Sequence, residues 1–194
     1  IRWLLSNVGL GGSIDVTNST HVAFGEAVTK KYAEYFRSRG CKYYSIGFDE
    51  ASFSTLYSEG KFGYVTSFGN ALSSILKEMG MVPRMYNDAV HYGSNFSYHF
   101  DRDIQILYWA NRGVVPDVMQ HLGYTMINNT ISLYWVLNGQ KVTAETIAGL
   151  NLLRGLHGGG LSKDGAGAVL SIWCTFQVKN TICCIQHNKK VSVS

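Results

Sequence analysis

The chain has 194 residues, of which 46% are hydrophobic and only 15% are charged. This composition excludes a disordered chain and fits one globular domain with a sizeable core. The formal net charge of +4 is small and spread along the chain, without the basic stripe of a nucleic-acid-binding protein, so we expect no nucleic-acid partner.

The first half of the chain alternates between helix and strand patterns. Apolar residues recur at helical spacing over residues 22–39 and again over 62–79. A short apolar run over 43–48 predicts a strand between these helices, and residues 82–87 predict a second strand.

The second half continues the alternation. Residues 104–109 predict a third strand, 115–122 a short helix, 124–128 a fourth strand and 168–173 a fifth. Strands that alternate with helices form parallel βα units. We therefore expect an α/β fold of the (β/α)8 barrel type, in which the carboxyl ends of all strands meet on one face. A doubly wound open sheet is the alternative, but no glycine-rich phosphate turn follows any strand.

The first predicted strand ends at two adjacent carboxylates, Asp49 and Glu50. Two such groups beside an apolar strand repel each other and lose solvation, so we expect one to keep its proton near neutral pH. A protonated acid beside a fixed anion is what cleavage of a glycosidic bond needs. The alternative is structural, because many strands end in an acidic residue where the chain meets water.

Polar or aromatic residues also follow the other predicted strands. The alternative interpretation is again structural: the tryptophans fill the core, and the Asn-Asp pair caps the next segment. A loop after the fourth strand is expected to hold two further aromatic residues. These candidate site residues are Asn87, Asp88, Trp109 and Trp173 at strand ends, and Tyr134 and Trp135 in the loop.

No cysteine or histidine spacing indicates a metal site, so we expect neither a metal nor a cofactor. The adjacent pair Cys183 and Cys184 cannot easily bridge each other, which favours free thiols. The apolar start of the chain is too short for a signal peptide or a membrane span, and we expect no membrane span.

Five segments together resemble glycoside hydrolase family 20, the β-N-acetylhexosaminidases, and most of all the surface enzymes of host-associated Gram-positive bacteria. The resemblance extends over residues 14–173, and its strength lies in the order of the segments. They are SIGFDE (45–50), MYND (85–88), ILYW (106–109), the stretch from GY to YW (123–135) and LSIW (170–173).

The resemblance implies a (β/α)8 barrel whose fourth strand ends at the Asp-Glu pair. We therefore expect an incomplete barrel in this chain, with about strands four to eight present, because five strands cannot close an eight-stranded barrel. Residues 1–175 are expected to form this partial catalytic domain, and 176–194 an atypical tail. The missing barrel segment, or other domains of a parent protein, would be its partners.

The resemblance also implies an activity: removal of terminal N-acetylhexosamine (GlcNAc or GalNAc) from glycans by retaining, substrate-assisted hydrolysis. Glu50 would be the general acid and base, and Asp49 would orient the acetamido group of the sugar. Tyr134 would hold the acetamido oxygen. The substrate-binding residues implied are Tyr86, Asn87, Asp88, Trp109, Trp135 and Trp173. A secreted or cell-surface enzyme is expected from the family.

Two departures from the family pattern favour an alternative. Tyr86 stands where many members have Trp, and Thr175 stands where they have an acidic residue that binds sugar hydroxyls. A neutral hydroxyl does not replace a charge-assisted hydrogen bond. An inactive or carbohydrate-binding relative is therefore one alternative, and an unrelated βα protein with a structural Asp-Glu pair is another. The chitinase pattern DxxDxDxE does not occur.

Overall fold

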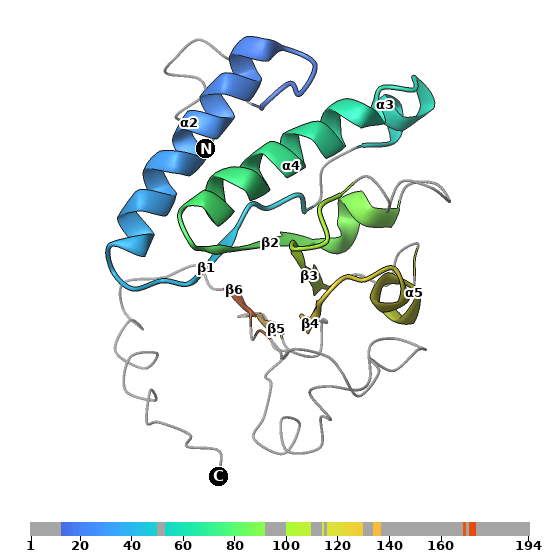
Figure 1. Cartoon of the computed structure of the whole chain (residues 1–194). Helices are drawn as coiled ribbons and strands as arrows, with labels where there is room; N and C mark the ends of the chain where they lie inside the picture. The colour runs from blue at the N-terminus through green and yellow to red at the C-terminus, as the bar shows by residue number, and fades with distance from the viewer. Residues whose placement is uncertain are drawn as a thin grey trace.

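A computed structural model describes residues 13–49, 53–91, 100–109, 114, 116–129, 134–136, 169 and 171–173 (Figure 1). The helices are α2 (Ser19–Arg37), α3 (Ser54–Ser58), α4 (Phe62–Glu78) and α5 (Pro116–His121), with a 3-10 helix, η1 (Asn87–His91). The strands are β1 (Tyr43–Ser45), β2 (Val82–Tyr86), β3 (Gln105–Tyr108), β4 (Met126–Asn128), β5 (Tyr134–Val136) and β6 (Ser171–Trp173).

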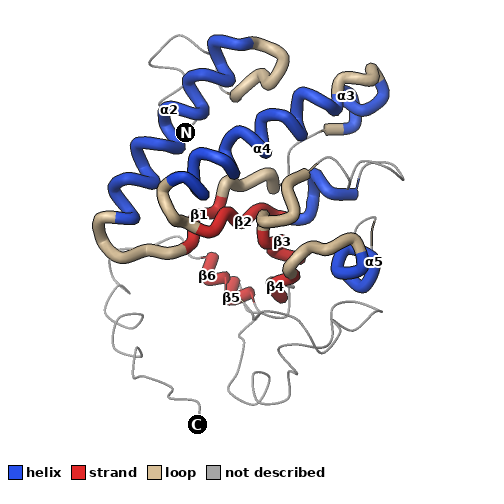
Figure 2. Tube along the Cα trace, in the orientation of Figure 1, coloured by secondary structure: helices blue, strands red, loops and turns tan. Residues whose placement is uncertain are grey.

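The strands are parallel and follow one another in chain order. The four-stranded sheet has the order β1-β2-β3-β4, and β5 pairs with β6. Figure 2 shows the strands curving round from β1 through β4 toward β5 and β6. A doubly wound sheet instead reverses its strand order at a switch point. The sequential order and the curvature favour the barrel type of α/β fold.

Helices α2 and α4 pack against each other and cover one face of the sheet (Figure 1). The apolar core lies between this helical layer and the strands, because alternate strand residues point toward the helices. Met85, Ile106 and Met126 come from neighbouring strands in register, and each is fully buried in this core.

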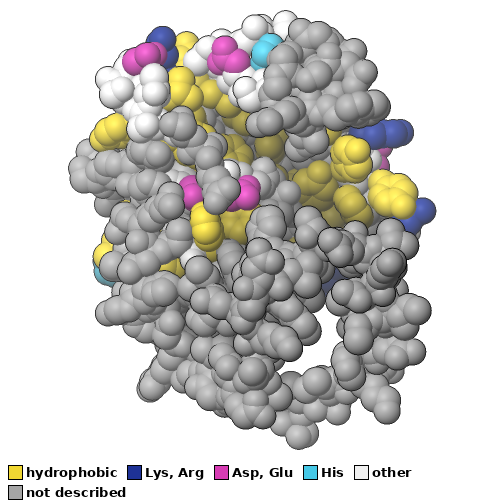
Figure 3. Space-filling model, turned by 180° about the vertical axis from the view of Figure 1, so that it is seen from behind, with side chains coloured by type: hydrophobic (Ala, Val, Ile, Leu, Met, Phe, Trp, Pro, Cys, Tyr) yellow, Lys and Arg dark blue, Asp and Glu magenta, His cyan; other side chains and the backbone are white. Residues whose placement is uncertain are grey.

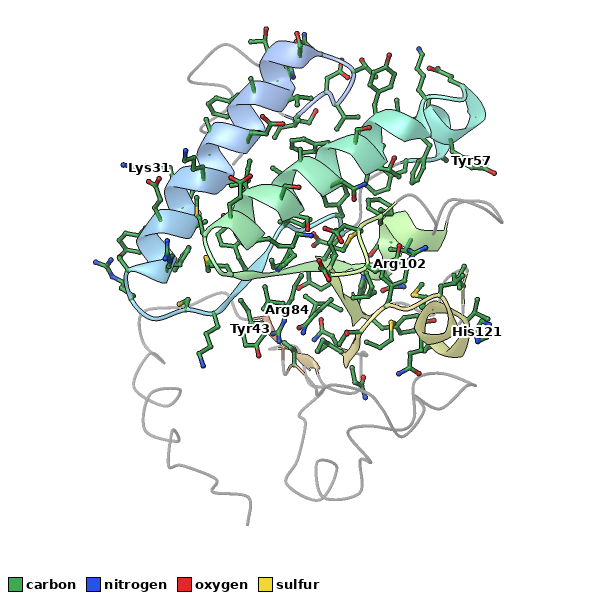
Figure 4. The ribbon with its side chains drawn as sticks, viewed as in Figure 1. Lys31, Tyr43, Tyr57, Arg84, Arg102 and His121 are labelled. Carbon is green, nitrogen blue, oxygen red and sulfur yellow. The ribbon has the colours of Figure 1, made fainter. Side chains whose placement is uncertain are left out.

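The opposite face of the sheet carries polar and aromatic side chains. The guanidinium carbon of Arg84 lies 3.7 Å from the ring centre of Tyr43, and Arg84 Nε donates to Gln105 Oε1 at 2.9 Å. Figure 4 shows Tyr43 and Arg84 side by side, away from α2 and α4. The inner surface of the curved sheet is therefore polar where β1, β2 and β3 meet.

The predicted long helices and all five predicted strands are confirmed, with ends shifted by a few residues. The first strand is shorter than predicted, because Gly47 and Phe48 both have positive φ angles, of 84° and 71°. Extended strand residues have negative φ. The hydrogen bonding nevertheless continues past the strand, since Ile46 N–H donates to Arg84 O at 2.8 Å.

The prediction of a loop at Tyr134 and Trp135 is wrong. Both residues lie on strand β5, which pairs with β6 in the register Tyr134 with Ser171. Residues 133–137 read LYWVL, a continuous apolar run of the length that is consistent with a buried strand, so the sequence carried a usable signal for β5.

Viewed from behind, acidic side chains lie beside hydrophobic ones near the middle of the molecule (Figure 3).

None of the helices described for this chain has the length and apolar character needed to cross a membrane.

Candidate active site

The candidate site lies along the edge where the parallel strands end. Asp49 follows β1, Tyr86 is the last residue of β2, and Trp109 follows β3. Because β1, β2 and β3 are parallel neighbours, their carboxyl ends share one edge of the sheet. Active sites of α/β barrels are built at this edge.

A tight turn positions Asp49. Gly47 accepts a backbone hydrogen bond from Tyr86 N–H at 2.9 Å, which ties the turn to the end of β2. Phe48 then points its ring into an aromatic cluster, with ring centres 6.0 Å from Phe53 and 6.3 Å from Phe100. The next side chain, Asp49, is left exposed at the strand edge.

The phenol of Tyr86 lies within the electrostatic influence of two carboxylates, those of Asp49 and Asp88. Burial raises the pKa of Tyr86 above its ordinary value of 10.0, and the negative charges of Asp49 and Asp88 raise it further. The phenol therefore keeps its proton at neutral pH and is a hydrogen-bond donor there. A hydrogen-bond donor, Tyr86, and a carboxylate, Asp49, thus belong to neighbouring ends of β1 and β2.

Asn87 and Asp88 contact Trp109 from the end of the neighbouring strand. Trp109 N–H donates to Asn87 Oδ1 at 3.0 Å, and the indole Nε1–H of Trp109 donates to Asp88 Oδ2. Asn87 is fully buried and Asp88 is 3% exposed, whereas Trp109 is half-buried. These bonds join the end of β2 to the end of β3.

The end of β4 continues this polar edge with Asn128 and Asn129, both buried. Val169 N–H donates to Asn128 O at 2.8 Å, and Asn129 Nδ2 donates to Val169 O at 2.8 Å. The chain just before β6 is therefore held against the end of β4. These asparagines are not among the candidate residues predicted from the sequence, although two consecutive polar residues at the end of an apolar strand are a usable signal.

The remaining candidate residues are only partly placed. Glu50 and Thr175 lie outside the described residues. Tyr134 and Trp135 lie on β5, and Trp173 lies on β6 in register with Val136, while the side chains of these strands are not described. In the described part of the chain, no group of three or more His, Cys, Asp or Glu side chains forms a candidate metal site.

The sequence of this chain is similar to that of a lacto-N-biosidase from Bifidobacterium bifidum. The two are 30% identical over 192 residues, which cover 87% of this chain and 17% of the relative. No protein-family profile matches the chain.

Solved structures share the fold. StrH, the pneumococcal virulence factor studied for N-glycan recognition and hydrolysis, aligns with a TM-score of 0.70 and 22% identity, covering 82% of this chain and 43% of StrH. Dispersin B aligns with a TM-score of 0.65 and 22% identity, over 84% of this chain and 54% of its own. A GH20 exo-β-N-acetylglucosaminidase from Vibrio harveyi has a TM-score of 0.58 and 15% identity, over 84% and 28%.

The fold and its neighbours define the class: a TIM-barrel-like α/β fold whose neighbours are GH20 hexosaminidases. The resemblance to glycoside hydrolase family 20 predicted from the motifs is confirmed. More particularly, this chain is a homologue of lacto-N-biosidase, and its homologues and neighbours are glycoside hydrolases. The chain spans less than two thirds of the length of these relatives.

Proposed function

We propose that this chain is part of the catalytic domain of a β-N-acetylhexosaminidase-type glycoside hydrolase. The enzyme would remove terminal N-acetylhexosamine (GlcNAc or GalNAc) from glycans. One observation carries the proposal: in this homologue of lacto-N-biosidase, Asp49, Tyr86 and Trp109 lie at or just after the carboxyl ends of three neighbouring parallel strands. A carboxylate, a protonated phenol and an aromatic ring at one edge match a site that binds and cleaves a sugar.

The proposed mechanism is retaining hydrolysis in which the 2-acetamido oxygen of the substrate attacks its own anomeric carbon. Glu50 protonates the leaving oxygen and then activates a water molecule, and Asp49 orients the acetamido N–H. Asp49 also stabilises the positive charge that develops on the ring formed in this step. Tyr134 donates to the acetamido oxygen, which completes the group of residues that hold the nucleophile.

Aromatic side chains form the walls of the proposed pocket. Tyr86 and Trp109 approach from β2 and β3, and Trp135 and Trp173 belong to β5 and β6, the pair that lies next to the end of β4. Apolar ring faces suit the C–H faces of a sugar, and an aromatic wall excludes water from the reacting bond.

The proposal extends to the whole protein. Residues 1–175 would supply about strands four to eight of a barrel, and 176–194 a separate tail. The remaining strands of the barrel would come from a further segment or domain, which fits the small share of each relative that this chain covers. By analogy with its bacterial homologues, the whole protein would be a secreted or cell-surface enzyme that acts on glycans.

The second candidate is a carbohydrate-binding relative without turnover. The observation that favours it is Thr175, which stands where the family has an acidic residue. A protein of this kind would bind N-acetylhexosamine through the aromatic walls and leave the glycosidic bond intact.

Hydrolysis of a chromogenic N-acetylglucosaminide by the full-length protein tests these proposals. We expect Glu50→Gln to lower kcat by about 10²–10⁴-fold, since the general acid is lost. Glu59→Gln is the matched control, because Glu59 pairs only at the surface, with Lys61 at 2.8 Å, and it should keep full activity. Binding of N-acetylglucosamine without any hydrolysis would favour the second candidate, and neither binding nor hydrolysis would reject both.

A further inference from the structure

Trp109 is held at two separate points by two consecutive residues. Its backbone N–H donates to Asn87 Oδ1 at 3.0 Å, and its indole Nε1–H donates to Asp88 Oδ2. Asn87 and Asp88 begin η1, directly after β2. One acceptor therefore fixes where the backbone of Trp109 lies, and the other fixes how its ring is turned.

The burial of Asn87 and Asp88 indicates that they bind Trp109 and not a ligand. Asn87 is 0% exposed and Asp88 is 3% exposed, so neither presents a polar surface of useful size to a ligand. A buried carboxylate is costly unless it is hydrogen-bonded, and its bond to the indole offsets part of that cost. Trp109 is half-buried, and it is the member of the group that reaches the surface.

We propose that Asn87 and Asp88 are positioning residues, which fix the ring of Trp109 as a wall of the sugar pocket. This inference rests on the proposed function, and it gives Asn87 and Asp88 a role other than the direct sugar contact expected from the resemblance. The χ2 torsion of tryptophan is broad, so packing alone leaves the indole several orientations. The carboxylate selects the orientation in which Nε1–H points at Asp88.

Fixing the ring before the substrate binds has a cost and a benefit. The cost is the burial of the Asp88 carboxylate, and the benefit is that no side-chain freedom of Trp109 is lost when the sugar arrives. A ring already in place also holds the sugar near the reactive geometry, which matters most in the transition state. We therefore expect loss of the bond to Asp88 to affect both KM and kcat.

The hydrogen bond itself is tested by NMR of the uniformly ¹⁵N-labelled full-length protein. The indole cross-peak of Trp109 is identified as the one that disappears in Trp109→Phe. We expect Asp88→Asn to move this peak upfield, because a charged acceptor is replaced by a neutral one, and to leave the other tryptophan peaks in place. Asp103→Asn, which removes a carboxylate that is 68% exposed, should leave the Trp109 peak unmoved. An unmoved Trp109 peak in Asp88→Asn would overturn the proposal whether or not the protein is active.

A double-mutant cycle separates positioning from direct sugar contact. Asp88→Asn replaces the charged acceptor of the indole N–H by a weaker neutral one, so this change alone should lower kcat/KM by about tenfold. In the Trp109→Phe background, the same change should have no further effect, because the group through which Asp88 acts is already gone. Equal losses in both backgrounds would show that Asp88 touches the sugar directly. The peaks of the other tryptophans report whether each variant is folded.

Discussion

Phe48 has a left-handed backbone conformation, with φ of 71°, which costs a residue with a β-carbon about 1–2 kcal/mol. Its ring packs against Phe53, Phe68 and Phe100, with centres 6.0–6.3 Å apart. Aromatic pairs of this kind contribute about 0.5–1.5 kcal/mol each beyond simple burial. The packing therefore outweighs the backbone strain, and it holds the turn that presents Asp49.

Two substitutions of Phe48 separate the packing of its ring from the strain of its backbone. Phe48→Ala loses the ring and keeps the strain, whereas Phe48→Gly loses the ring and relieves the strain. Both variants should be less stable than the unmodified chain, but Gly should be more stable than Ala by about 1 kcal/mol. Urea unfolding measures the difference, and a Gly variant less stable than the Ala variant would show that the conformation is not strained.

At the level of the element, helix α4 approaches the aromatic cluster closely at one glycine. A β-carbon on Gly69 would lie 2.9 Å from Phe100 Cε1 and 3.4 Å from Phe48 Cζ. Glycine normally weakens a helix interior, by about 1 kcal/mol relative to alanine. Here it allows the helix to pack against rings that lie just beneath the candidate site.

Two alanine substitutions on the same helix should have opposite effects. Gly69→Ala should destabilise the fold by about 1–3 kcal/mol, because Phe100 must move to admit the methyl group. Gly63→Ala meets no atom within 4 Å, so it should stabilise by up to about 1 kcal/mol through helix propensity. Thermal unfolding of both variants checks this, and a stabilised Gly69→Ala would mean that the contact is not tight.

Local sequence patterns predict most of the elements, long and short, but not the contacts between them. Helix α4 has enough turns for its apolar period to show, and its prediction was accurate to a single residue. Strand β5 lies within the apolar run LYWVL of residues 133–137, which is consistent with a buried strand, so the prediction of a loop at Tyr134 and Trp135 overlooks a signal in the sequence. The strand-end positions of Asp49 and Trp109 followed from the pattern. The bond from Trp109 to Asp88 could not, because it depends on which strands lie side by side.

At the scale of the whole molecule, Asp101 ties α4 to the segment that leads into β3. Its carboxylate accepts from Ser73 Oγ at 2.9 Å and from Lys77 Nζ at 2.6 Å, and its N–H donates to Asn70 Oδ1 at 2.8 Å. Partial burial acts to raise the pKa of Asp101, but hydrogen bonds from Lys77, the Asp103 backbone and Ser73 outweigh it and lower the pKa below 3.8. The ionised form therefore stabilises the fold.

Asp101→Asn should lower the free energy of unfolding by about 1–2 kcal/mol near pH 7, with the part due to Lys77 discounted because that side chain is 38% exposed. Since the folded pKa is depressed, this stabilisation is fully present above about pH 4 and is lost as the pH falls through the folded value. Unfolding curves of the two proteins should therefore converge below pH 4. A difference that stayed constant from pH 7 to pH 3 would contradict the role of the charge. Glu59→Gln, at an exposed ion pair, serves as the control.

The charge of Arg84 restricts what can cover the inner face of this sheet. Its guanidinium stacks on Tyr43 and donates one hydrogen bond to Gln105, yet arginine carries five N–H donors. Burial lowers the pKa of Arg84, but an arginine keeps its charge in proteins. A purely apolar covering layer would leave a desolvated cation, at a cost of several kcal/mol. Any layer that covers this face must therefore bring oxygen acceptors to the Arg84 guanidinium or admit water beside it, near β1 and β2.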